Sequence, residues 1–167
     1  MDADIYYFVW RATVQLMAEI ATTESTDRPV GDSVRHPVDS GTVSIAERSI
    51  GYAEYGDPSG RPVVVFHGTP GTHRLGGLFA PLAAERGIRL LAVDRPGYGD
   101  SNRWPERSLA DIGGVVAAVL DAAGVDAAGM VGFSGGGPHA LAVAATHGDR
   151  VSSVDIISGS TPPAVGD

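Results

Sequence analysis

The sequence has no cysteine and no lysine, and none of its apolar runs approaches the roughly 18 residues needed to span a bilayer. Without cysteine there are no disulfides, thiolate nucleophiles or cysteine-ligated zinc, and this fits a reducing compartment, so we expect a cytoplasmic protein. Arginine alone supplies the 12 basic side chains against 20 acidic ones, for a net charge of −8. We expect no nucleic-acid partner, because such binding depends on cationic side chains that neutralise phosphates.

The first 37 residues differ in character from the rest of the chain. Residues 5–10 form an apolar cluster, but Asp2 and Asp4 give this end the wrong charge for a secretory signal. The segment around this cluster is interpreted as a helical or disordered extension, and the polar stretch up to residue 37 as a linker. We therefore divide the chain into an extension over residues 1–37 and a folded domain over residues 38–167.

From residue 38 onward, short apolar runs alternate with segments of helical periodicity. This alternation is typical of βαβ units, which combine parallel strands with helices on both faces of the sheet. The sequence therefore predicts an α/β fold with a mostly parallel, doubly wound sheet. The expected strands are 43–47, 49–54, 62–66, 88–93, 127–133 and 151–158, and the expected helices are 75–86, 112–124 and 135–147.

Three loops that directly follow predicted strands have unusual sequences. Residues 67–71 read His-Gly-Thr-Pro-Gly, residues 94–101 read Asp-Arg-Pro-Gly-Tyr-Gly-Asp-Ser, and residues 132–136 read Gly-Phe-Ser-Gly-Gly. The last is a Gly-x-Ser-x-Gly motif, in which a serine is held on a sharp turn between a strand and a helix, as predicted here for Ser134. No lysine follows the glycines at 135–137, which argues against a phosphate-binding loop.

Together, the three motifs resemble those of the α/β-hydrolase superfamily in their order and spacing. The resemblance implies that Ser134 is a nucleophile and that the backbone N–H groups of Thr69 and Gly135 form an oxyanion hole. It implies hydrolysis of an ester or related bond in a small molecule, without a cofactor or a metal ion. It also assigns supporting positions to four residues. His67 and Gly68 lie in the loop over residues 67–71, and Gly132 and Gly136 flank the serine in the sharp turn over residues 132–136, called the nucleophile elbow.

Other polar residues near the strand ends have alternative interpretations. His67 could be a base, but in the resembled family the histidine of this loop is generally structural. His139 lies on the helix that follows the serine, where its ring cannot readily turn back to the hydroxyl. His73 could line the pocket, and Asp94 and Arg95 could form a structural ion pair or shape the site.

A serine nucleophile needs a histidine base and an acid that orients it, and in this family both follow the serine in the chain. None of the acids and imidazoles after Ser134 has the family's position: Asp149, Asp155, Asp167, His139 and His147. The resemblance therefore covers the N-terminal portion of the family's domain, truncated after about strand six. We expect the chain alone to be inactive or weakly active. The last strand should border the sheet, where a partner chain or self-association could cover it.

Two other functions stay open at this point. The main alternative is a non-catalytic truncated fragment, or a half-domain that pairs with a chain supplying the missing acid and histidine. A cofactor-free lyase or oxygenase is a weaker alternative, which stands because a fold does not determine a function. Enzyme-like hydrolysis of a p-nitrophenyl ester by the purified chain, abolished by Ser134→Ala, would contradict the expected inactivity.

Overall fold

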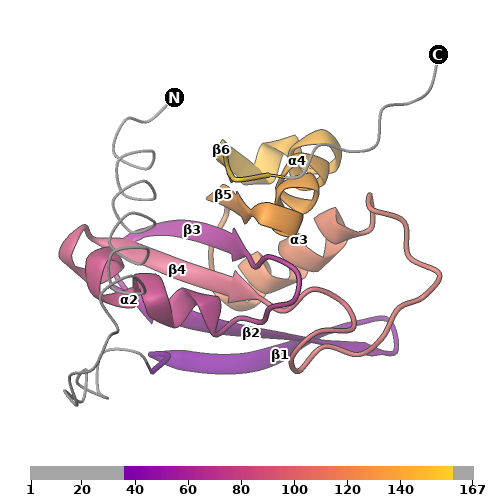
Figure 1. Cartoon of the computed structure of the whole chain (residues 1–167), viewed down its shortest axis with the longest axis horizontal. Helices are drawn as coiled ribbons and strands as arrows, with labels where there is room; N and C mark the ends of the chain where they lie inside the picture. The colour runs from indigo at the N-terminus through magenta and orange to yellow at the C-terminus, as the bar shows by residue number, and fades with distance from the viewer. Residues whose placement is uncertain (1–35, 160–167) are drawn as a thin grey trace, which may run out of the picture.

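The structure, a computed structural model, describes residues 36–159 (Figure 1). The predicted extension over residues 1–37 thus lies outside the described residues, except for its last two positions. The described residues form one six-stranded sheet with helices and short 3₁₀ turns. The strands are β1 (Asp39–Ile45), β2 (Arg48–Gly56), β3 (Arg61–Phe66), β4 (Ile88–Val93), β5 (Ala128–Phe133) and β6 (Val151–Ile157). The helices are α2 (Leu75–Glu85), α3 (Ile112–Ala122) and α4 (Gly137–Thr146), and the 3₁₀ turns are η2 (Ser134–Gly136) and η3 (Gly148–Arg150).

The predicted strands and helices of the folded domain are all present, with two informative differences at their ends. β1 begins at Asp39, earlier than predicted, because its pairing with β2 continues as far as the pair of Asp39 and Glu54. α4 begins at Gly137, later than predicted, because Ser134 has a φ of 50° and residues 134–136 form the turn η2. The predicted start at residue 135 thus falls within η2, and the α-helix begins where this turn ends.

The sheet has the strand order β1-β2-β4-β3-β5-β6. β4, β3, β5 and β6 run parallel, and β1 and β2 add an antiparallel edge. The chain leaves β3 to form β4 on one side of it and then crosses to form β5 on the other side. In sheets of this kind, the loops at the carboxyl ends of the strands around such a switch point form the ligand crevice. The three predicted motif loops follow these same strands.

The helices cover both faces of the sheet, as predicted for a doubly wound fold (Figure 1). Alternate residues of β3 serve the two faces: Val65 packs in the cluster that contains Phe79 of α2, and Phe66 packs in the cluster that contains residues of α3 and α4. All three of these side chains are buried. The last four residues of β3, 63–66, are thus apolar because neither face of the strand meets water there.

β6 borders the sheet in the described part of the chain, where its strand partner is β5. Its side chains are less buried than those of β5, and Ile156 is 41% exposed. This agrees with the expected position of the last strand, and the covering partner chain stays a prediction. Within residues 36–159, no helix is long and apolar enough to cross a membrane.

Candidate active site

Ser134 lies directly after β5, in the left-handed backbone conformation that the motif requires, with φ at 50°. The flanking glycines are needed because the chain turns back tightly on itself. A Cβ atom on Gly132 would lie 2.6 Å from the Cα atom of Gly137, and one on Gly136 would collide with the carbonyl oxygen of Phe66. Side chains at these two positions would therefore prevent the sharp turn that exposes the serine.

The structure brings the elbow and the loop after β3 together. A Cβ atom on Gly135 would lie 2.6 Å from Oγ1 and 3.5 Å from the backbone nitrogen of Thr69. A Cβ atom on Gly68 would lie 3.3 Å from the Cβ atom of Ser134. The residues that were predicted to form the oxyanion hole are thus neighbours of each other and of the serine.

The two predicted N–H donors differ in how they are held. The N–H of Thr69 makes no hydrogen bond to any residue between 36 and 159. Gly135 lies in η2, in a first turn where backbone N–H groups lack acceptors within the turn. The N-terminus of α4 follows directly, and its dipole favours negative charge at this position.

His67 is almost completely buried and uses both ring nitrogens in backbone contacts. Nε2 accepts a hydrogen bond from the backbone N–H of Arg95 at 3.3 Å, and Nδ1 donates to the carbonyl oxygen of Gly68 at 2.7 Å. Burial lowers the pKa of His67, and the nearby guanidinium of Arg95 lowers it further. The neutral ring links the loops after β3 and β4, and neither nitrogen is available to take a proton from Ser134.

His139 lies on α4 and is 8% exposed. Its Nδ1 donates to the carbonyl oxygen of Gly135 at 3.2 Å. Burial lowers the pKa of His139 to about 4, and the charge of Arg95 contributes to this shift. A neutral His139 therefore holds the elbow from the side of the helix, and its Nδ1 contacts the backbone of Gly135.

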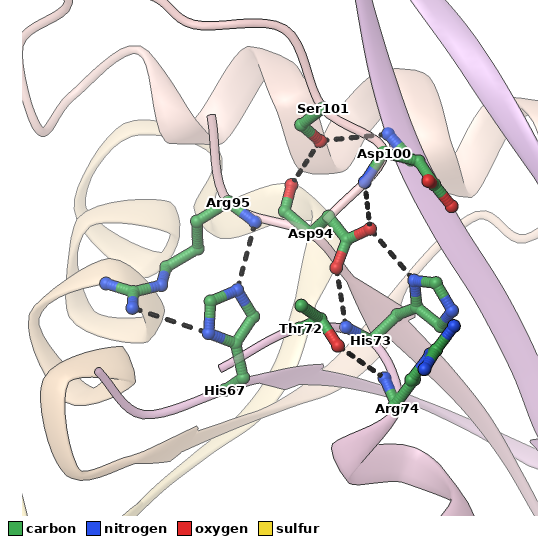
Figure 2. A network of polar contacts seen from close by, with 9 residues as sticks. His67, Thr72, His73, Arg74, Asp94, Arg95, Asp100 and Ser101 are labelled. Atoms are coloured by element: carbon green, nitrogen blue, oxygen red, sulfur yellow. Dashed lines mark hydrogen bonds and ion pairs between the residues drawn. The ribbon is translucent and has the colours of Figure 1, made fainter. Parts of the chain in front are cut away.

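Asp94 pairs with His73, and the ion pair with Arg95 that the sequence left open is not formed within the described residues (Figure 2). Oδ2 of the buried Asp94 lies 2.8 Å from Nδ1 of His73 and accepts a hydrogen bond from the N–H of Asp100 at 2.9 Å. The other carboxylate oxygen accepts the backbone N–H of His73. Asp94 thus joins its own loop to the loop after β3.

His73, Asp94 and Asp100 are also a possible cation-binding group, because one ligand atom from each lies within 4.8 Å of the others. Both oxygens of Asp94 already accept N–H groups, however. A Cβ atom on Gly99 would collide with this carboxylate, so the backbone closes over it. The cluster is therefore explained as a hydrogen-bonded link between two loops.

Arg95 makes contacts at the candidate site that the sequence did not reveal. Its guanidinium donates to the carbonyl oxygens of Gly68 at 2.9 Å and Gly135 at 3.3 Å, and to Oγ1 of Thr69 at 2.7 Å. It therefore joins the loop after β3 to the nucleophile elbow. Its place at the end of a predicted strand was the only sequence signal for this position.

Comparisons with known proteins identify the family to which this fold belongs. A family profile described as the alpha/beta hydrolase fold matches residues 61–167. The AB hydrolase superfamily protein YisY of Bacillus subtilis is 32% identical over 105 residues, and Epoxide hydrolase B of Mycobacterium tuberculosis is 34% identical over 105 residues. A solved alpha/beta hydrolase fold protein from Nakamurella multipartita is 34% identical and superposes with a TM-score of 0.65, covering 77% of this chain and 44% of that protein.

The matched regions are parts of longer relatives. The match covers 62% of this chain and 39% of YisY, and 61% of this chain and 30% of the epoxide hydrolase. The family profile nevertheless spans β3 to β6 and all three motif loops. The chain belongs to the α/β-hydrolase fold family.

Proposed function

We propose that this chain supplies the nucleophile and the oxyanion hole of a serine hydrolase that acts on an ester or related acyl bond of a small molecule. Oγ of Ser134 attacks the acyl carbon and forms the new C–O bond, and the carbonyl oxygen takes on negative charge. The N–H groups of Thr69 and Gly135 stabilise that oxygen. The leaving group departs with the proton that Oγ loses, and water then releases the acid from the acyl-serine.

One observation carries this proposal: a serine with a φ of 50° lies between β5 and the N-terminus of α4, facing the loop after β3. A non-glycine residue in left-handed backbone costs about 1–2 kcal/mol, and in this serine motif the cost has a functional reason. Exposure of a nucleophile at the end of a strand is such a reason.

The proposal includes an expectation about rate. Oγ needs a base to take its proton, and no histidine within residues 36–159 hydrogen-bonds to Ser134. Without base and acid, serine hydrolases retain about 10³- to 10⁴-fold catalysis over water from the oxyanion hole and substrate binding. We therefore propose that acylation of Ser134 by this chain is measurable but slow.

Covalent labelling tests the nucleophile without requiring turnover. The purified chain is incubated with a fluorophosphonate, and the adduct is weighed by intact-mass spectrometry and located by peptide mapping. We expect one adduct per chain, on Ser134, and no adduct after Ser134→Ala. The control Ser44→Ala changes an exposed serine on β1, at the opposite edge of the sheet, and should label like the wild type. An adduct elsewhere, or none, contradicts the proposal and favours a non-catalytic role.

A further inference from the structure

We propose that Arg95 is a positioning residue of the oxyanion hole: its guanidinium holds the backbone behind both N–H donors and adds a positive charge beside them. This inference rests on the proposed function, because it gives Arg95 a part in the acylation of Ser134. It concerns a residue that contacts no reacting atom. It acts on the N–H of Thr69 through that donor's own peptide group, and on the N–H of Gly135 by holding the next peptide group along the chain.

The peptide group between Gly68 and Thr69 carries the first part of the argument. Nη2 of Arg95 donates to its carbonyl oxygen, that of Gly68, at 2.9 Å, and the N–H of the same peptide group belongs to Thr69. A cationic donor on an amide oxygen polarises the amide, so its N–H becomes a stronger donor. Nη2 also donates to Oγ1 of Thr69 at 2.7 Å, which fixes this residue against the arginine.

The elbow carries the second part. Nη1 of Arg95 donates to the carbonyl oxygen of Gly135 at 3.3 Å, and Nδ1 of His139 donates to the same oxygen at 3.2 Å. Two donors therefore hold this residue from two directions. Because one guanidinium reaches both Gly68 and Gly135, it sets the separation of the two oxyanion donors.

No carboxylate among residues 36–159 forms an ion pair with Arg95. Arg95 is 4% exposed, and within residues 36–159 its hydrogen bonds go to carbonyl and hydroxyl oxygens and to His67. Its guanidinium carbon lies 4.6 Å from the ring centroid of Tyr98. This cation–π contact stabilises the positive charge without neutralising it. Burial lowers the pKa of Arg95, but arginine stays protonated at neutral pH. The positive charge thus remains available to a developing oxyanion.

A purely structural arginine and a positioning residue differ in which reaction they affect. We would measure acylation of Ser134 by p-nitrophenyl acetate and by the matching thionoester, in which sulfur replaces the carbonyl oxygen. Sulfur accepts hydrogen bonds weakly, so the thionoester gains little from an oxyanion hole. Loss of positioning lowers the oxoester rate selectively, whereas general damage to the site lowers both rates.

We expect Arg95→Gln to lower the oxoester acylation rate about 10- to 100-fold, which is less than the 10²- to 10³-fold loss on removing a direct oxyanion donor. The thionoester rate and the half-saturating concentration should stay within about threefold of wild type. Arg95→Lys keeps the charge but lacks the fork that reaches both carbonyls, so it should lose about tenfold. The control Arg150→Gln removes a guanidinium that also donates to backbone carbonyls, those of Val125 and Asp126, and should leave both rates unchanged.

Two results would overturn the inference: an unchanged oxoester rate in the Arg95 variants, or equal losses with both substrates. Circular dichroism establishes that each variant is folded, and Arg95→Lys decides the question if Arg95→Gln does not fold. The parallel measurement on Ser134→Ala separates the two proposals. If that variant still acylates, the proposed function fails. If it does not acylate and the Arg95 variants match the wild type, only the inference about Arg95 fails.

Discussion

Nδ1 of His73 lies 2.8 Å from Oδ2 of Asp94, and this contact joins the loop after β3 to the loop after β4 (Figure 2). The carboxylate of Asp94 is buried and also accepts the backbone N–H groups of His73 and Asp100. The candidate active site therefore rests on loops that are held to one another by a buried charge.

Replacing this carboxylate should destabilise the fold. Both carboxylate oxygens of Asp94 accept N–H groups, and Asp94→Asn leaves only one acceptor oxygen. Hydrogen bonds to a charged acceptor contribute about 1.5–3 kcal/mol each. We expect the free energy of unfolding in urea to fall by about 2–3 kcal/mol. Asp126→Asn changes an exposed carboxylate between α3 and β5, and it should have little effect. Equal effects of the two variants would show that the buried contacts of Asp94 contribute little.

The left-handed backbone of Ser134 predicts a gain in stability on substitution by glycine. Ser134→Gly should be about 1 kcal/mol more stable than Ser134→Ala, because glycine adopts a positive φ without steric cost. Ala46, in the turn between β1 and β2, has a φ of 52°, so Ala46→Gly should gain a similar amount away from the site. Urea unfolding of the variants measures both differences. A gain at Ala46 without one at Ser134 would argue against strain at the elbow.

A methyl group at Gly135 should separate the two residues of the proposed oxyanion hole, Thr69 and Gly135. Its Cβ atom would lie 2.6 Å from Oγ1 of Thr69, so one of the two loops must move. We expect Gly135→Ala to lower the acylation rate of Ser134 at least tenfold, in keeping with the roughly 10²-fold or greater cost of losing an oxyanion donor.

The matched control for this substitution is Gly114→Ala. Gly114 is an exposed residue of α3, and a Cβ atom there would meet nothing within 4 Å. Alanine should raise stability by about 0.5–1 kcal/mol through its helix propensity and leave acylation unchanged. Equal acylation rates in the two variants would contradict the proposed role of Gly135 in the oxyanion hole.

The lowered pKa of His139 predicts that the protein loses stability in acid. Because burial lowers its folded-state pKa to about 4, the unfolded chain binds this proton more tightly, and unfolding becomes easier as the pH falls from about 6.5 towards 4. We expect His139→Gln to remove about 2 kcal/mol of the change in unfolding free energy between pH 7 and pH 4.5, after allowance for solvent screening.

Denaturant titrations at several pH values measure this effect. Leu141→Gln, a substitution of an exposed residue on the same helix, should keep the wild-type slope of stability against pH. A His139→Gln curve parallel to that of the wild type would mean that His139 binds its proton equally well in the folded and unfolded states.

Much of this fold is predictable because its signals are local. β4 lies at the predicted residues 88–93, where an apolar run ends at a loop of distinctive sequence. The start of α4 was predicted too early because residues 135 and 136, which follow the serine, belong to the 3₁₀ turn η2 and not to the α-helix. The strand order around β3 depends on crossovers between distant segments, and the βαβ alternation predicted only that the sheet is mostly parallel.

The sequence by itself determined the α/β pattern, the family resemblance and the serine on its strand-to-helix turn, because apolar periodicity and glycine placement act over a few residues. The tertiary structure alone decided which side chains meet. Asp94 and Arg95 are neighbours in the chain, yet their side chains point in different directions (Figure 2). Asp94 therefore meets His73, and Arg95 meets Gly68 and Gly135, because only the folded sheet brings these three loops to one edge.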